Sequence, residues 1–378
     1  MEHFTAELFV AGSALAQDWF LLLPLPVVLL ANWHERHRSH PFQGLGAAVA
    51  DMIWPVLVLI AVAAVFLGLL LGSLLYTANP AHAGPGPWLF AAVMAATGVA
   101  AGAVSHRGIR ERLSNLLPID PDSALDATAL VLVLVTIGYQ LANQLAVDVL
   151  ARQASLQPLG VEDMIAQELP FLLTAFFGVG FLIRRPPRLT LRRLGWVRPS
   201  PWQVLLALAA AGLFYAFGSG ADRLTHLLTP VTAHRLDIVN QRLFGGLHGP
   251  GGIAVLALSA GICEETLFRG AIQPRLGLLV AALVFAALHT EYGLTIDEVA
   301  VFVLALGLGA VRRLTNTTGS IICHVVYDTL VAVGMSGVWL AVALVTEAGL
   351  ILVSLAAYLS GRLPPGDPAA AVGRSEQV

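Results

Sequence analysis

The sequence contains no lysine, and all 21 of its basic residues are arginine. Charge is scarce altogether, because acidic and basic residues make up only 12% of the 378 positions, about half the share in an average soluble domain. The missing lysine excludes a catalytic lysine base. The net charge of −3 comes without a basic surface, so nucleic acid is not an expected partner.

Cysteine is nearly absent as well. The two cysteines, Cys263 and Cys323, lie inside apolar runs, so no disulfide framework is expected. They directly precede Glu264 and His324, which suggests a Cys–His nucleophile. However, adjacent residues of a helix point about 100° apart, and a buried thiol in apolar surroundings is unreactive. We therefore interpret both cysteines as small core residues.

Apolar residues are abundant. They make up 57% of the chain, and the mean hydropathy is +0.77. Repeated apolar runs long enough to cross a bilayer of about 30 Å predict an all-α, polytopic transmembrane helical bundle. We expect about ten or eleven spans, near residues 8–31, 46–76, 87–105, 126–149, 168–183, 201–219, 252–271, 277–290, 299–311, 317–334 and 336–359.

Arginine positions predict how these spans are threaded. With the N-terminus outside and the C-terminus in the cytoplasm, 17 of the 21 arginines fall on the cytoplasmic side, as positively charged residues usually do. The four on the other side are Arg152, Arg223, Arg235 and Arg242. We expect a multi-pass integral protein of the bacterial cytoplasmic membrane.

The expected organisation has four parts. Residues 1–220 form an N-terminal transmembrane block of unassigned role, and 221–251 an amphipathic, glycine-rich connection. Residues 252–345 form a helical core that carries the polar motifs, and 346–378 the end of the last span with a disordered cytoplasmic tail. The arginine-rich segment 184–200 is either a plain cytoplasmic loop or lies among lipid headgroups with its Leu and Trp side chains turned inward.

Two adjacent carboxylates, Glu264 and Glu265, lie inside the expected span 252–271. An ionisable group at that depth costs about 3 kcal/mol or more, which makes it a functional candidate by default. Glu265 and Arg269 are four residues apart and share a helix face, where they can pair. Glu264 is rotated by about 100° and has no such local partner. It is therefore free to take a proton.

Two further polar motifs follow on neighbouring spans. In Phe285-Ala-Ala-Leu-His289 the phenyl ring and the imidazole share one helix face. In His324-Val-Val-Tyr-Asp328 the same spacing lets the carboxylate reach the imidazole. The expected spans place all three motifs near the middle of the membrane, so we expect them to converge on one cavity.

The order Glu-Glu-x-x-x-Arg, Phe-x-x-x-His and His-x-x-x-Asp resembles the CAAX protease and bacteriocin-processing family, also called the Abi family, which includes the type II CAAX prenyl endopeptidases. The resemblance covers about residues 250–345. It implies that the core 252–345 is catalytic. It also implies an intramembrane endopeptidase, embedded in the lipid bilayer, that hydrolyses a peptide or a membrane-tethered protein.

The resemblance implies roles for individual residues. Glu264 and His289 position and deprotonate the attacking water, and His324 and Asp328 face the developing oxyanion. The residues with structural or orienting roles are Glu265, Arg269 and Phe285.

A second mechanism uses the same atoms. Glu264, His289 and His324 could ligate Zn²⁺ and leave one position open for water, but no cofactor is certain. Asp328 stands where many family members carry Asn. An amide can donate to an oxyanion, whereas an ionised Asp can only accept. Asp328 therefore either stays protonated, orients His324 or ligates the metal, and these alternatives stay open.

Two other classes of function are alternatives. The first is a catalytically idle membrane scaffold, or a bacteriocin-immunity or regulatory protein, with the same fold. The intact motifs, with both Glu264 and His289 present, argue against it. The second is a transporter that uses Glu264 and Glu265 as a proton relay. The lack of an inverted repeat in the sequence argues against it.

Overall fold

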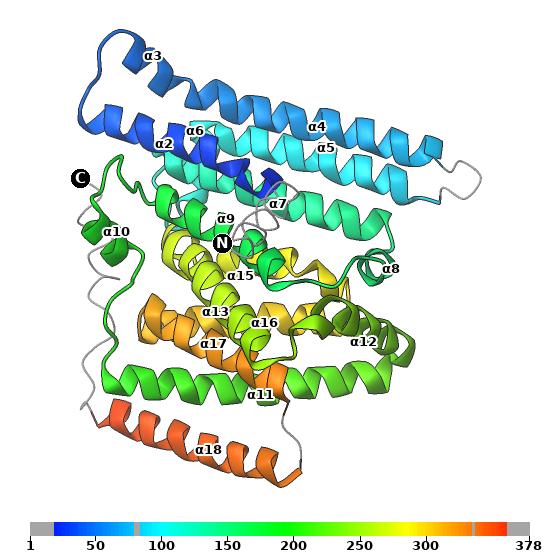
Figure 1. Ribbon diagram of the computed structural model, residues 1–378. Helices are drawn as coiled ribbons and strands as arrows, with labels where there is room; N and C mark the ends of the chain where they lie inside the picture. Colours follow the sequence, from blue (N-terminus) through cyan, green and yellow to red (C-terminus); the bar gives the residue numbers. More distant parts are fainter. Residues whose placement is uncertain (1–18, 79–83, 335–336, 361–378) are drawn as a thin grey trace, which may run out of the picture.

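The computed structural model describes residues 19–78, 84–334 and 337–360 (Figure 1). Within these ranges helices are the regular secondary structure, and β-structure is limited to one isolated bridge between Phe181 and Arg185. The expected all-α fold is therefore confirmed.

The helices before residue 200 are η1 (Trp19–Leu22), α2 (Pro24–Ser39), α3 (Leu45–Asp51), α4 (Ile53–Ala78), α5 (Gly86–Ser105), α6 (Arg107–Leu113), α7 (Ala124–Ala146), α8 (Val149–Ala154), α9 (Val161–Gly178) and α10 (Pro187–Arg193). Those after it are α11 (Pro201–Leu228), α12 (Pro230–Phe244), η2 (Gly245–Leu247), α13 (Pro250–Glu265), the π-helix η3 (Thr266–Ile272), α14 (Gln273–Leu276), α15 (Leu278–Leu288), η4 (Thr290–Tyr292), α16 (Ile296–Leu314), α17 (Thr317–Val333) and α18 (Gly337–Leu359).

Several of these helices can cross a membrane. Five stretches of the described residues are long and apolar enough, namely Leu45–Thr77, Gly86–Ser105, Ala124–Ala146, Pro201–Leu228 and Pro250–Leu276. Two shorter apolar helices are Leu278–Leu288 and Thr317–Val333. A polytopic helical bundle is thus confirmed, while the orientation of its termini stays a prediction.

The boundaries differ from the expected spans at some places. Helix α2 continues to Ser39, past the expected end at residue 31, and the first part of that span lies outside the described residues. Helix α11 runs to Leu228, and α12 fills much of the expected connection 221–251. The expected disordered tail lies largely beyond residue 360, outside the described residues.

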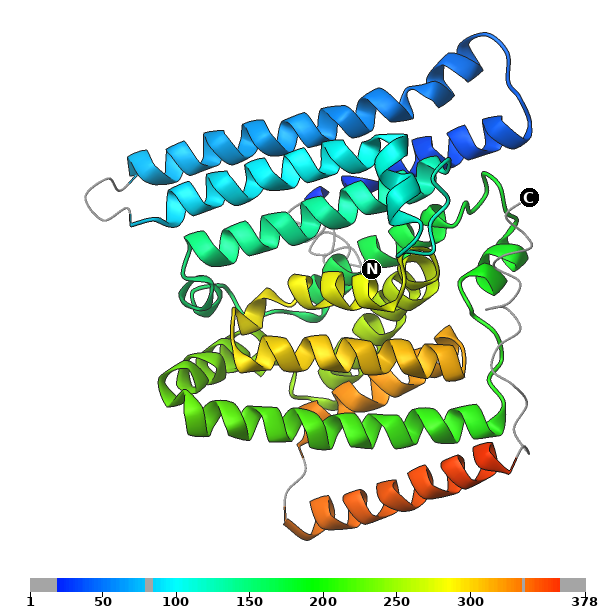
Figure 2. The same cartoon turned by 180° about the vertical axis from the view of Figure 1, so that it is seen from behind.

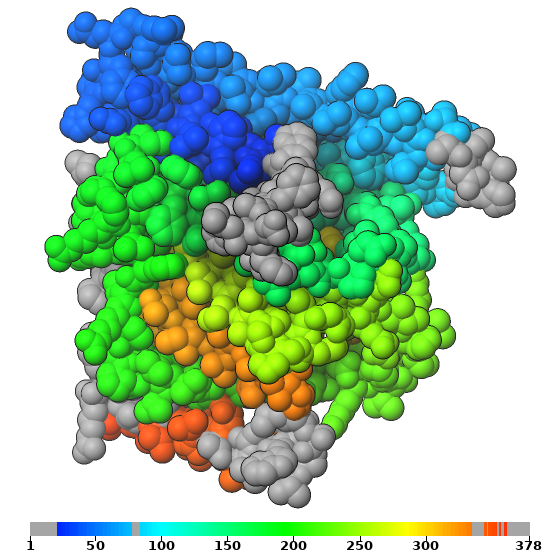
Figure 3. Space-filling view, in the orientation of Figure 1, coloured from blue at the N-terminus to red at the C-terminus, as the bar shows by residue number. Residues whose placement is uncertain are grey.

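Two rows of helices build the bundle. Seen from behind, α4, α5, α7, α15, α16, α11 and α18 lie side by side, each packed against the next (Figure 2). In front of this row, α2, α9, α13 and α17 pack against one another in that order (Figure 1). The yellow-green α13 and the orange α17 share the front face (Figure 3). The main apolar core lies between the rows, so the ends of the motif-bearing helices meet inside the protein.

The segment 184–200 docks on this core. Leu194 is fully buried, and Trp196 packs against the main apolar cluster. The Trp196 indole Nε1 donates a hydrogen bond of 3.0 Å to Thr266 Oγ1 in η3. These two side chains therefore turn toward protein rather than lipid, whereas Leu189 of the same segment is 46% exposed.

Candidate active site

The two glutamates occupy the last turn of α13, directly before the chain widens into the π-helix η3. π-Helical turns are rare and occur frequently at functional sites. Two glycines allow close packing around this turn. A Cβ on Gly261 would lie 2.5 Å from Val325 Cγ2 in α17, and one on Gly270 would lie 2.8 Å from the Leu194 carbonyl oxygen. The backbone of α13 and η3 is therefore held tightly on both sides.

Glu265 is completely buried and fully partnered. Its Oε1 forms an ion pair with Arg269 Nη1 at 3.1 Å and lies 3.0 Å from His324 Nδ1. Ser320 Oγ donates to the other oxygen, Oε2. Because an ionised carboxylate can only accept, His324 donates through Nδ1. Glu265 thus links α13, η3 and α17.

Arg269 joins this link to the rear row of helices, which contains α15 and α16. Its Nη2 donates to the Ala305 carbonyl oxygen of α16 at 3.2 Å. Its guanidinium carbon lies 4.3 Å from the centre of the Phe285 ring of α15, a distance at which a cation and an aromatic face attract. The arginine therefore ties Glu265 to α15 and α16.

His324 lies between carboxylates on both of its ring nitrogens. Nδ1 faces Glu265, while Nε2 lies 3.5 Å from Asp328 Oδ2 and 4.0 Å from Glu264 Oε2. Glu264 is 7% exposed, and its Oε2 makes no hydrogen bond to any described residue. The two neighbouring glutamates thus differ sharply in their surroundings.

His289 reaches the cluster through Phe285. Its ring stacks on the Phe285 ring with centroids 4.4 Å apart, and its Nδ1 lies 2.8 Å from the Phe285 carbonyl oxygen. The Phe285 ring is in turn 6.0 Å from the His324 ring. His289 interacts electrostatically with Glu264, although no direct hydrogen bond joins the two in the described part of the chain. The three motifs are therefore brought together around Phe285 and His324.

Zinc ligation by Glu264, His289 and His324 stays a prediction. Among the described residues no group of three or more His, Cys, Asp or Glu side chains could hold a metal ion. His324 Nδ1 is bonded to Glu265, which leaves its Nε2 facing Asp328 and Glu264.

Comparison with known proteins agrees with the motifs. Residues 246–330 match the family model described as type II CAAX prenyl endopeptidase Rce1-like. The chain contains an Rce1-like domain. The matched segment holds all three motifs, so the resemblance is confirmed at the family level.

The chain is also similar to the uncharacterized protein YpbD of Bacillus subtilis (strain 168). The two are 43% identical over 54 residues, which is 14% of this chain and 28% of that protein. The match therefore spans less than a third of the relative's length. No solved structure matches the chain significantly.

One carboxylate near the Rce1-like motifs was missed by the sequence interpretation. Glu168 of α9 is buried, its Oε2 makes no hydrogen bond to a described residue, and its charge interacts with those of Glu264, His324 and Asp328. The sequence does contain an indication of this residue, because Glu168 is an acidic residue at the start of the expected span 168–183. An acid in such a span is a functional candidate for the same reason as Glu264.

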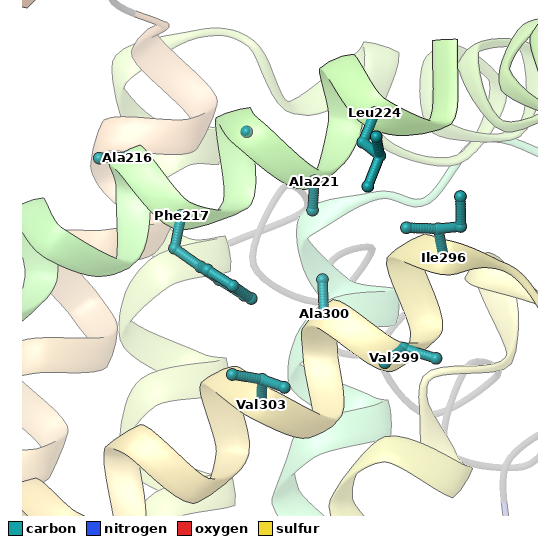
Figure 4. A pocket seen from close by; sticks show the side chains of 9 residues that line it. Ala216, Phe217, Ala221, Leu224, Ile296, Val299, Ala300 and Val303 are labelled. Carbon is teal, nitrogen blue, oxygen red and sulfur yellow. The ribbon is translucent and has the colours of Figure 1, made fainter. Parts of the chain in front are cut away.

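A pocket of about 360 Å³ lies apart from these motifs, between α11 and α16 (Figure 4). Its lining is entirely apolar and includes Phe217 and Leu224 of α11 and Val299 and Val303 of α16. No titratable side chain lines it. It is therefore not a candidate for the catalytic centre.

Proposed function

We propose that this chain is an intramembrane endopeptidase, which hydrolyses a peptide bond in a membrane-associated protein or peptide at the bacterial cytoplasmic membrane. The observation that carries the proposal is the contrast between two adjacent carboxylates. Glu265 is saturated with partners, whereas Glu264 is buried with an oxygen that no described residue bonds. A carboxylate left free inside a polar cluster is available to take a proton. The Rce1-like match supports the same class of reaction.

In this proposal Glu264 is the general base, and His289 helps to orient the attacking water. The water oxygen adds to the carbonyl carbon of the scissile peptide as Glu264 accepts the water proton. Positioned general bases contribute about 10²–10⁴-fold to such a step. The stacking of His289 on Phe285 restricts its ring, so it can orient the water without a large loss of conformational freedom.

His324 and Asp328 act on the oxyanion that forms next. As an imidazolium tied to Glu265 through Nδ1, His324 can donate from Nε2 to the carbonyl oxygen as that oxygen gains charge. A fixed donor of this kind is worth about 2.7–4 kcal/mol of transition-state stabilisation. Asp328, 3.5 Å from Nε2, orients the imidazolium and offsets its charge. The carbon–nitrogen bond then breaks and the amine leaves with a proton.

The test is cleavage of a prenylated CAAX reporter peptide by the purified chain in lipid vesicles, beside the same peptide without the prenyl group. We expect Glu264→Gln to lower kcat by about 10²–10⁴-fold while thermal unfolding stays at the wild-type temperature. Glu162→Gln, at the start of α9, is the matched control and should cleave normally. Undiminished cleavage by Glu264→Gln would show that the base has been assigned wrongly.

Two further arms of this experiment define the reaction. Cleavage of only the prenylated peptide would assign prenyl-protein processing, and cleavage of both would assign a general membrane peptidase. In the proposed mechanism Glu264 activates the water directly, so we expect a chelator to leave the activity intact. Activity that disappears in chelator and returns with Zn²⁺ would replace the water-activation mechanism with a metal-dependent one.

A further inference from the structure

Glu168 is a buried carboxylate that belongs to none of the three motifs. It is 7% exposed, and its Oε2 makes no hydrogen bond to any residue that the structure describes. Burying an acid without a partner is unfavourable, and within a membrane such a residue is retained mainly for function. The side chains that surround Glu168 therefore indicate its role.

The packing of α9 brings Glu168 to the site. Helix α9 packs on both α13 and η3. One turn after Glu168, the Phe171 ring meets the Phe268 ring edge-on with centroids 6.0 Å apart, and Phe268 follows Glu264 by one turn. The charge of Glu168 also interacts with that of Glu264. Glu168 therefore lies on the helix that packs against α13 and η3, within electrostatic range of the proposed base.

We propose that Glu168 is a second catalytic carboxyl, which supplies the proton that the leaving amine receives. This inference rests on the peptidase function proposed above. Two carboxyl groups close together in apolar surroundings favour sharing a single proton, because ionising both is unfavourable. The two histidines have other roles in that mechanism, since His324 donates to the oxyanion and His289, whose Nδ1 faces the Phe285 carbonyl oxygen, orients the water.

The protons balance over one cycle. Glu264 takes a proton from water as the water oxygen bonds to the peptide carbonyl carbon. The carbon–nitrogen bond then breaks, its electron pair stays on nitrogen, and the protonated carboxyl of Glu168 transfers its proton to that nitrogen. The proton on Glu264 finally passes to Glu168. One water has been divided between an acid and an amine, and both glutamates are restored.

The experiment compares Glu168→Gln with Glu162→Gln, a matched substitution in the first turn of the same helix. Gln is neutral and close to Glu in size, so it replaces a buried protonated glutamate without a gap, but it cannot deliver a proton. We expect Glu168→Gln to lower kcat by about 10²-fold with KM changed by no more than about twofold. The alkaline fall of kcat, which reports loss of the acid's proton, should be missing in this variant.

A structural glutamate would behave differently. If Glu168→Gln keeps the wild-type kcat and the wild-type pH profile while Glu264→Gln is inactive, this inference fails and the peptidase function stands.

Infrared spectroscopy provides a readout independent of activity. The carbonyl band of protonated carboxylic acids should lose intensity in Glu168→Gln and keep its wild-type intensity in Glu162→Gln. A band that Glu168→Gln leaves unchanged would overturn this inference, whether or not a peptide is cleaved. Failure of the wild type to cleave any peptide would instead end the peptidase proposal.

Discussion

Helices α4 and α5 are held together differently from helices α13 and α17. A Cβ on Gly68 of α4 would collide with Met94 of α5, and one on Gly98 of α5 would lie 2.5 Å from the Ala61 carbonyl oxygen. No charged side chain takes part in these contacts, and close backbone approach is a common way to join helices in lipid. In contrast, α13 and α17 combine one close glycine contact with the buried Glu265–His324 bond.

The two regions also differ in how far their side chains are exposed. Leu59, Val62 and Phe66 of α4 are each more than half exposed, as expected of side chains that face lipid. Glu265 and Arg269 are at most 1% exposed. The contact between α4 and α5 is thus built from small and apolar residues, whereas the contact between α13 and α17 includes buried charge.

The largest expected effect on stability comes from Arg269→Ala. The change leaves Glu265 buried without its cation, which typically costs about 3–5 kcal/mol. Unfolding of the purified protein in detergent, followed by denaturant titration or heating, should show this loss together with loss of cleavage.

The double variant Glu265→Leu/Arg269→Met is the control for this prediction. It removes both charges and fills the space with apolar atoms, so stability should largely return. Cleavage should stay low, because His324 has lost the partner of its Nδ1. Wild-type unfolding of Arg269→Ala would mean that the ion pair does not hold the site together, and the contrast between the two regions would disappear.

A smaller effect is expected from Gly98→Val in α5. The added side chain would press on the Ala61 carbonyl oxygen and on Val65, and overpacking of this kind costs about 1–3 kcal/mol. The kcat of the folded protein should not change, because α5 packs mainly against α4, α6 and α7. Both quantities can be measured on one detergent preparation.

Gly102→Ala is the matched control in the same helix. Its new Cβ would lie 3.7 Å from the Ala61 Cβ, an ordinary contact, so neither stability nor kcat should fall. A loss of kcat in Gly98→Val without a loss of stability would show that the N-terminal helices take part in catalysis. The α4–α5 and α13–α17 regions would then not differ in function.

The sequence predicted those features that depend on local geometry. The Glu265–Arg269 pair and the Phe285–His289 stack both follow from a spacing of four residues, although each pair extends past the end of its α-helix. Helical class and span positions followed from apolar runs of sufficient length. The helix end was missed at α11, because Asp222 and Arg223 interrupt the apolar run although the helix continues to Leu228.

Features that depend on packing between helices could not be predicted in this way. The π-helical turn after Glu265 is accommodated by contacts with Leu194, which comes from a distant part of the chain. The bond between Glu265 and His324 joins residues 59 positions apart. The position of Glu168 near the motifs depends on the packing of α9 against α13. Spacing within one helix carries no information about a neighbouring helix.

The smallest expected effect concerns the segment that supports the π-turn from outside. In Trp196→Phe the ring can still pack near Phe176, but the hydrogen bond to Thr266 is lost. We expect about 1 kcal/mol of destabilisation and a modest fall in kcat. Trp202→Phe is the matched control, because the Trp202 Nε1 is buried without a hydrogen-bond partner in the described structure, and this change should be neutral or slightly stabilising. Equal losses in both variants would assign the effect to indole volume. A loss confined to Trp196→Phe would show that the segment 184–200, outside the motif-bearing core, helps to hold the site.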